Sequence, residues 1–365
     1  MPSKELYLAA VEFQKAKLWE MLYDNDLFAV RYTDGETGYA SVMGYEKSHY
    51  ALALYMGEAG LYSYSQIESL PEDASLSLRR DCFLSQSSLS CSFEKSTELT
   101  ERDRAELRKY GISSKPRLMP LFRKYEPFKY PWYMDDLTDE QRLLPALKAG
   151  AEIARRLSHD TVQTTMRSAE NGISKVKRQL GFDSRTLPVL NVTEEGFTWQ
   201  TESRPENWPV KSLSPSLANE LEIARLKKVI PEPGRSWYCH VMMFPSALEG
   251  EPPRFPAFMM LLDSGKGMVR MPVAEHFPEQ ADEVMKGFLN YLNEQGKPEC
   301  VYAQGRLTYY LLKTLAEQIG LALIENDRIP EIEEAEDGFI RYIESGAVGE
   351  KAAPLDGRTS KKENE

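Results

Sequence analysis

The sequence has few of the features that mark common catalytic and metal sites. It holds only four cysteines and four histidines in 365 residues. No C-x-x-C pair and no histidines at ligand spacing are present, so neither a zinc site nor a redox pair is predicted. Glycine-rich phosphate loops, the Gly-x-Ser-x-Gly elbow and the His-Glu-x-x-His pair are also absent. We therefore expect no catalytic residue, metal ligand or cofactor of these classes, and each histidine is expected at the surface or at a helix cap.

Long apolar runs and an excess of positive charge are missing too. No segment approaches the roughly 20 apolar residues that span a bilayer, and the N-terminus lacks the basic and apolar regions of a signal peptide. We therefore expect a cytoplasmic protein with no membrane partner. The formal net charge of −11 disfavours a nucleic-acid partner, because phosphate binding needs a basic face, although a local basic patch stays open.

The clearest pattern in the sequence is an alternation of strand-like and helix-like segments in the C-terminal half. An apolar run, Phe258–Leu262, ends at Asp263 and precedes a glycine-rich turn, which predicts a β-hairpin. Two amphipathic segments then predict helices whose apolar faces, including Phe288 and Leu311, cover a sheet. The resulting order is a strand over 237–244, the hairpin, a helix over 281–292, a strand over 300–303, a helix over 305–319 and a strand over 321–324. A β-hairpin followed by βαβαβ order predicts an α/β domain with parallel pairing across a helix.

The N-terminal half has a different pattern. An opening helix over 6–22 precedes three short strand-like runs separated by glycine turns, which indicates an antiparallel meander. The fold class is therefore α+β, with an antiparallel-sheet N-terminal domain with helices and an α/β C-terminal domain. We place the first domain at 1–185, including a helical connection, and the second at 186–345, beginning with a hairpin over 189–200. Residues 70–86 are expected to form a loop, and 346–365 a disordered tail.

A set of structural residues spread over both halves carries a resemblance. In order, these are Trp19, Leu22, Asp24, Asp26, Phe28, Val30, Tyr39, Ser41 to Gly44, Leu54, Tyr55, Gly57, Gly60, Leu61, Pro256, Leu262, Asp263, Ile329 and Pro330. Together they resemble a bacterial family of two-domain proteins of unknown function, over most of the chain up to about Ile343. Some relatives add a cysteine-rich zinc motif at one end, and nothing in this sequence matches it.

A strip of prolines, aromatic residues and basic residues runs from Pro116 to Trp132. Its candidate binding residues are Arg117, Arg123, Tyr125 and Trp132. Aromatic rings beside arginines can stack bases or hold extended peptides, which favours a recognition strip. The alternative is a long connection that its rings pin to the domain, because prolines break both helix and sheet.

Asp263 is the remaining candidate. The order of strands and helices around it is similar to the ribonuclease H-like nuclease fold, in which carboxylates from a first strand and a later strand end hold two metal ions. The later strand here ends in Ala303 and Gln304, and an amide does not supply the charge that Mg²⁺ needs. We therefore expect Asp263 to cap its turn, and an Asp263→Asn change to cost about 1 kcal/mol or less.

These observations predict a non-catalytic binding or accessory protein with a protein or small-molecule partner. The alternative is a metal-dependent phosphodiester hydrolase with a degenerate ribonuclease H-like domain.

Overall fold

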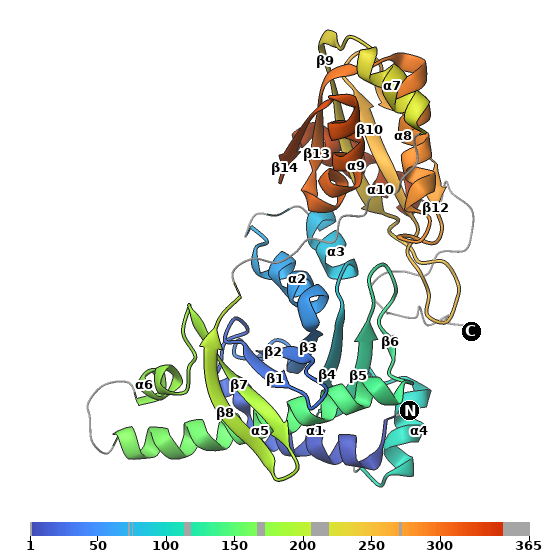
Figure 1. Ribbon diagram of the computed structural model, residues 1–365. Coiled ribbons are helices and arrows are strands. Elements are labelled where there is room, and N and C mark those ends of the chain that lie inside the picture. The colour runs from blue at the N-terminus through green and yellow to red at the C-terminus, as the bar shows by residue number, and fades with distance from the viewer. Residues whose placement is uncertain are drawn as a thin grey trace, which may run out of the picture. The chain divides into compact units, whose positions relative to one another are not determined.

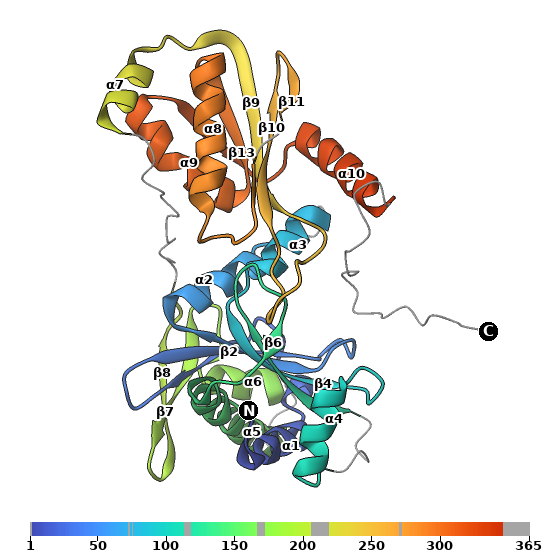
Figure 2. The same cartoon turned by 90° about the vertical axis from the view of Figure 1, so that its right-hand side faces the viewer.

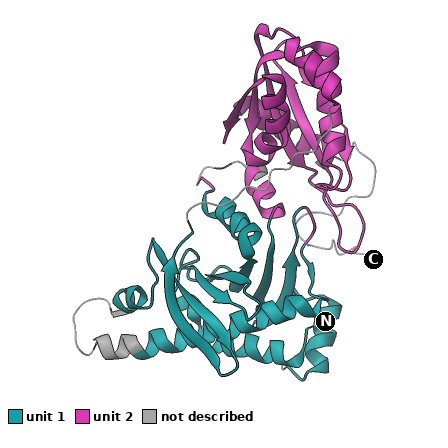
Figure 3. Ribbon diagram, in the orientation of Figure 1, with its two compact units in different colours: residues 1–69, 86–127, 131–210 teal, residues 70–85, 128–130, 211–365 magenta. Residues whose placement is uncertain are grey.

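A computed structural model of the chain describes residues 2–71, 74, 76–112, 118–165, 172–205, 219–269 and 272–345 (Figure 1). The chain divides into two compact units, each assembled from separate segments (Figure 3). Unit 1 comprises Met1–Ser69, Gln86–Pro127 and Pro131–Val210, and unit 2 comprises Leu70–Ser85, Phe128–Tyr130 and Lys211–Glu365. The predicted tail, 346–365, lies outside the described residues.

Unit 1 is built on one eight-stranded sheet with the order β6-β5-β4-β3-β2-β1-β7-β8. Every neighbouring pair is antiparallel except β1 and β7, which are parallel. The antiparallel-rich N-terminal sheet that the sequence predicts is therefore confirmed. The strands are β1 (Phe28–Arg31), β2 (Thr37–Met43), β3 (Ala51–Met56), β4 (Ser88–Glu94), β5 (Met119–Tyr125), β6 (Trp132–Tyr133), β7 (Thr186–Thr193) and β8 (Gly196–Ser203).

Helices cover both faces of this sheet. Successive residues of a strand point to opposite faces, so alternate residues meet different helices. Leu52 and Leu54 of β3 share an apolar cluster with the first helix and the long helix, whereas Ala53 and Tyr55 pack against Leu61 of α2. The helices are α1 (Lys4–Ala16), the 3-10 turn η1 (Leu18–Glu20), α2 (Gly57–Glu68), α4 (Glu101–Lys109), α5 (Leu137–Thr165) and α6 (Gly172–Gln179). Although α5 has 29 residues, no helix within the described ranges has the length and apolar character to cross a membrane.

Unit 2 contains the α/β layer predicted from the C-terminal half. Its sheet has the order β11-β10-β9-β13-β14, and a short strand, β12, also pairs with β10. Strand β9 pairs antiparallel with β10 and parallel with β13, and β14 continues the parallel part. The strands are β9 (Glu232–Met243), β10 (Ala257–Asp263), β11 (Gly267–Val269), β12 (Val273–Ala274), β13 (Pro298–Gln304) and β14 (Ala322–Asn326).

The helices of unit 2 lie unequally on the two faces of its sheet. Helices α7 (Glu220–Lys228), α8 (Ala281–Gln295) and α9 (Gly305–Ile319) join the cluster on one face, and α9 ends at Gly320 in the left-handed conformation, as expected for a C-terminal glycine. Helix α10 (Pro330–Glu344) lies on the opposite face from α8 (Figure 2). A helix of nine residues from the first half of the chain, α3 (Leu76–Leu84), also belongs to this unit.

Three local predictions differ from the structure. The hairpin β7–β8 does not begin the second domain, because β7 pairs with β1 in the sheet of unit 1. Residues 70–86, expected as a loop, contain helix α3. The strip 116–132, expected as a structureless segment, contains strand β5, whose Pro120 is tolerated because β6 pairs with β5 only at Arg123 and Lys124.

The helical face assigned from the sequence generates a stability prediction. Phe288 of α8 is 1% exposed and its ring meets Trp237 edge to face, with centroids 5.6 Å apart. Phe288→Ala should therefore lower the free energy of unfolding by about 3–5 kcal/mol, the usual cost of such a core truncation. Urea denaturation measures this, and Leu221→Ala at an 84% exposed site should change stability by less than about 0.5 kcal/mol. Equal effects at both positions would show that the α8 face is not the core.

Candidate functional site

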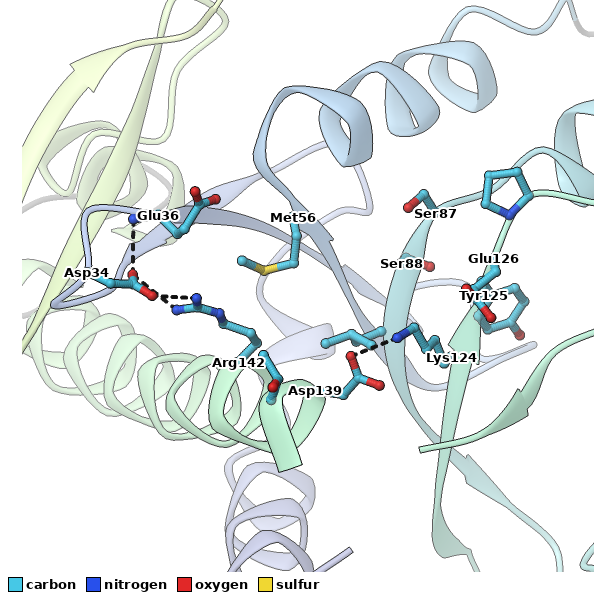
Figure 4. Close-up of a pocket in the computed structure, with 13 residues that line it drawn as sticks. Asp34, Glu36, Met56, Ser87, Ser88, Lys124, Tyr125, Glu126, Asp139 and Arg142 are labelled. Carbon is cyan, nitrogen blue, oxygen red and sulfur yellow. Dashed lines mark hydrogen bonds and ion pairs between the residues drawn. The ribbon is translucent and has the colours of Figure 1, made fainter. Parts of the chain in front are cut away.

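A pocket of about 660 Å³ lies at one end of the strands of unit 1 (Figure 4). We name it the strand-end pocket, and its volume lies in the usual range for small-ligand sites. The turn after β1, the end of β3, the start of β4, the end of β5 and the first turns of α5 supply its lining. The lining residues are Asp34, Glu36, Met56, Ser87, Ser88, Leu89, Lys124, Tyr125, Glu126, Pro127, Thr138, Asp139 and Arg142.

Both cations of the strand-end pocket form ion pairs with carboxylates of the same pocket. Arg142 binds Asp34 through both guanidinium NH₂ groups, with Nη1 3.2 Å from Oδ1, and its guanidinium lies 4.7 Å from the Tyr32 ring centre. Lys124 Nζ lies 3.1 Å from Asp139 Oδ1. The hydrogen bond from Arg142 lowers the pKa of Asp34, whereas burial raises the pKa of Asp139 despite the opposing effect of Lys124.

Two further carboxylates leave the lining with more negative than positive charge. Glu36 and Glu126 lie at opposite ends of the pocket in Figure 4. Together with Asp34 and Asp139 they make four carboxylates in the lining, against two cations. Glu36 is exposed, and its Oε2 lies beside Gly57, where α2 begins. The lining of the strand-end pocket therefore contains carboxylates, two serines and a tyrosine, together with two cations that form ion pairs.

The predicted strip residues separate in the structure. Tyr125 lines the strand-end pocket, and Trp132 is the cross-strand partner of Lys124. Arg123 instead forms two hydrogen bonds, of 3.0 and 2.8 Å, with the carboxylate of Asp103 at the start of α4. Arg117 lies outside the described residues. Thus one of the four lines the pocket, one is its near neighbour, and Arg123 is held in a structural ion pair.

Asp263 lies in unit 2 and has more partners than a turn cap. Its Oδ1 accepts from Gly265 N–H at 2.9 Å, which is the capping contact that the sequence predicts. It also forms a two-bond ion pair with Arg235 and accepts from Tyr291 Oη at 2.7 Å. Burial acts to raise the pKa of Asp263, but the hydrogen bonds from Arg235, Tyr291 and Gly265 outweigh it and lower the pKa to about 2.

These side chains do not fit the two-metal site that the ribonuclease H-like resemblance implies. In that fold the first carboxylate lies on the first strand of the sheet. Here the first strand in the sequence is β9, whereas Asp263 ends the second strand, β10. The charge of Asp263 is balanced by Arg235, and Gln304 Oε1 accepts from Ile329 N–H at 2.8 Å. Among the residues that the structure describes, no three His, Cys, Asp or Glu side chains are grouped to hold a metal ion.

The sequence missed a buried charged cluster in unit 2. His240, expected at a surface or a cap, is 3% exposed in β9 and lies between two carboxylates. Its Nδ1 bonds Glu336 of α10, and its Nε2 lies 3.3 Å from Asp81 of α3, which also lies beside Arg80. Burial acts to lower the pKa of His240, but Glu336 and Asp81 outweigh it and raise the pKa to about 10. Partners so far away in the sequence left no local signal.

The Asp263 contacts change the expected effect of its substitution. Asp263→Asn removes the charge that balances Arg235, whose side chain is 8% exposed and keeps only Glu232 as an acidic partner. The free energy of unfolding should fall by about 2–3 kcal/mol, above the 1 kcal/mol expected for a turn cap alone. Urea denaturation at pH 7 measures it. A loss no larger than that of the control Asp282→Asn, at a partly exposed ion pair with Lys286, would leave Asp263 with only its capping role.

His240 generates a pH prediction. Its folded pKa lies above the unfolded value of about 6.5, so the stabilisation is fully present below pH 6.5 and is lost as the pH rises through about 10. His240→Asn should cost about 3 kcal/mol at pH 6.5 and clearly less at pH 10. Urea denaturation of both proteins across this range gives the difference. A constant difference would mean that His240 is neutral in the folded protein.

Comparison with known protein families agrees with the division into two parts. Residues 4–174 match a domain of unknown function, DUF7309, and residues 222–340 match another domain of unknown function, DUF6930. A search of curated proteins finds no match. These two matches confirm the two-domain resemblance that the sequence carries. The chain thus matches two family models of unknown function in succession, which is consistent with a two-domain protein.

Proposed function

We propose that this protein is a non-catalytic, cytoplasmic binding protein whose strand-end pocket takes a ligand carrying amine or guanidinium groups. The observation that carries the proposal is the charge of the lining, in which four carboxylates face two cations that already form ion pairs. An anionic ligand would have to break one of these pairs and approach Glu36 and Glu126. A cationic ligand needs neither step.

The shape of the strand-end pocket supports a ligand with more than one cationic group. Glu36 and Glu126 lie at its two ends, with Met56 and Leu89 among the lining residues (Figure 4). A flexible diamine could place one ammonium group beside the exposed Glu36, its methylene chain against Met56, and its second ammonium group toward the Glu126 end of the pocket. Tyr125 adds an aromatic ring, to which cations are attracted.

The same chemistry could come from two sources. A free polyamine carries two or more ammonium groups on a short aliphatic chain. A partner protein could present neighbouring lysine or arginine side chains from an exposed segment. Binding to spermidine alone favours the first source, and binding only to a lysine-rich peptide favours the second.

Isothermal titration calorimetry with spermidine and with a short lysine-rich peptide tests the proposal. We expect Glu36→Gln to weaken the binding of at least one of them about three- to fivefold, since one partly solvated ion pair contributes about 1 kcal/mol or less. The binding should also weaken as salt is added. The peptide with acetylated lysines should not bind.

A matched control separates the pocket from the general negative charge of the protein. Glu46→Gln removes the same charge at an exposed turn outside the lining and should leave the affinity unchanged. The proposal fails if the two variants behave alike, or if inorganic phosphate binds while both amines do not.

A further inference from the structure

A row of large apolar side chains crosses the sheet of unit 2 from edge to edge. The strand register places Met268 opposite Leu262, Leu262 opposite Tyr238, Tyr238 opposite Tyr302 and Tyr302 opposite Ile324. Residues directly opposite each other on paired strands point to the same face of a sheet. The five side chains, which we name the cross-sheet row, therefore form one line over all five strands.

The cross-sheet row is open to solvent. Met268 is 63% exposed and Ile324 is 44% exposed, and the three residues between them are partly exposed. The rings of Tyr238 and Tyr302 stack with centroids 5.5 Å apart and planes 20° from parallel. Contiguous exposed apolar side chains of this kind usually mark a binding surface, whereas single ones do not.

Two helices reach this face of the sheet beside the row. Helices α8 and α9 share the opposite face, whereas α10 packs on this face (Figure 2) and α3 reaches it at His240 through Asp81. Helix α10 packs over Met242 and Phe258, in a cluster that Tyr238, Leu262 and Tyr302 of the row adjoin. The row keeps its partial exposure beside both helices.

Helix α10, which adjoins the cross-sheet row, exposes more negative than positive charge. Its exposed side chains include Glu331, Glu334 and Asp337, against one exposed cation, Arg341. Its apolar residues share a cluster with Tyr238 and Tyr302, so the two surfaces are continuous. A partner that covers the row thus meets apolar side chains and, next to them, a helix with exposed carboxylates.

We propose that the cross-sheet row docks a basic amphipathic helix of a partner protein, beside α10. Four gaps between strands of about 4.8 Å make the row about 19 Å long, which matches a helix of about 13 residues. The apolar face of the partner helix covers the row, and its lysines or arginines face the carboxylates of α10. This surface belongs to unit 2 and is independent of the strand-end pocket.

Charge also distinguishes this partner from the other occupants. A second copy of the chain would bring one acidic α10 against another, because a two-fold contact places like surfaces together. Single-stranded nucleic acid could stack on Tyr238 and Tyr302, but its phosphates would lie beside the same carboxylates. A basic helix is the occupant that gains from both the row and the carboxylates of α10.

A designed pair of peptides tests the proposal. One has about 18 residues with leucines at helical spacing and lysines elsewhere, and the other has glutamates in place of the lysines. Fluorescence anisotropy with the full chain should show binding of the lysine peptide and at least tenfold weaker binding of the glutamate peptide. Met268→Ser with Ile324→Ser should weaken the lysine peptide about tenfold or more.

Matched variants make the result specific. Leu221→Ser with Ile230→Ser removes two apolar side chains that are 84% and 86% exposed elsewhere in unit 2, and should have no effect. Glu334→Gln with Asp337→Asn should weaken binding more than Glu194→Gln with Glu195→Gln, which makes the same charge change on the β7–β8 turn. Glu36→Gln should have no effect, which separates this surface from the strand-end pocket.

Several outcomes would overturn the docking proposal. The lysine peptide does not bind, or the control pairs weaken it as much as the row pairs do. Sedimentation shows a dimer that Met268→Ser with Ile324→Ser dissociates, which would assign the row to a second copy. A labelled oligo(dT) binds, and the same double variant abolishes that binding, which would assign the row to nucleic acid.

Discussion

Each sheet depends on a point where antiparallel pairing changes to parallel pairing. In unit 1 the parallel pair is β1 and β7, each with an antiparallel neighbour on its other side, and in unit 2 the change occurs at β9, between β10 and β13. A parallel neighbour cannot be reached by a tight turn, so the chain must cross the face of the sheet before it returns. Helix α8 makes this crossing before β13, and α5 and α6 precede β7. Both sheets therefore acquire helical cover as a consequence of strand direction.

Local patterns in the sequence predict local structure well and strand partners poorly. The order from β10 to β14 was predictable because glycines and prolines mark the ends of segments with clear periodicity, such as Gly296 and Gly320. The hairpin β7–β8 was equally visible, but nothing in it shows that β1, far earlier in the chain, is its neighbour.

The candidate sites divide in the same way. The turn contact of Asp263 was predictable from a carboxylate followed by a glycine-containing turn. Its contacts with Arg235 and with Tyr291 of α8 were not, because each of these residues lies 28 positions away in the sequence. His240 meets Glu336 across 96 residues, so its burial had no local sign. The strand-end pocket draws on five separate segments, of which sequence reasoning singled out only Tyr125. Charge pairing between distant segments is what the sequence alone did not reveal.

The discontinuous composition of unit 2 affects the order in which it can form. Helix α3 leaves the ribosome well before β9 is synthesised, yet Asp81 completes its ion pair only with His240 of that strand. Domains generally fold as units during synthesis from the N-terminal end. Here the segments that follow α3 form much of the sheet of unit 1, and they are synthesised before β9. Helix α3 is therefore inserted between segments of unit 1 and has no partner strand until β9 has been made. A gene fragment that begins at residue 211 would encode the sheet of unit 2 without the helix that supplies Asp81.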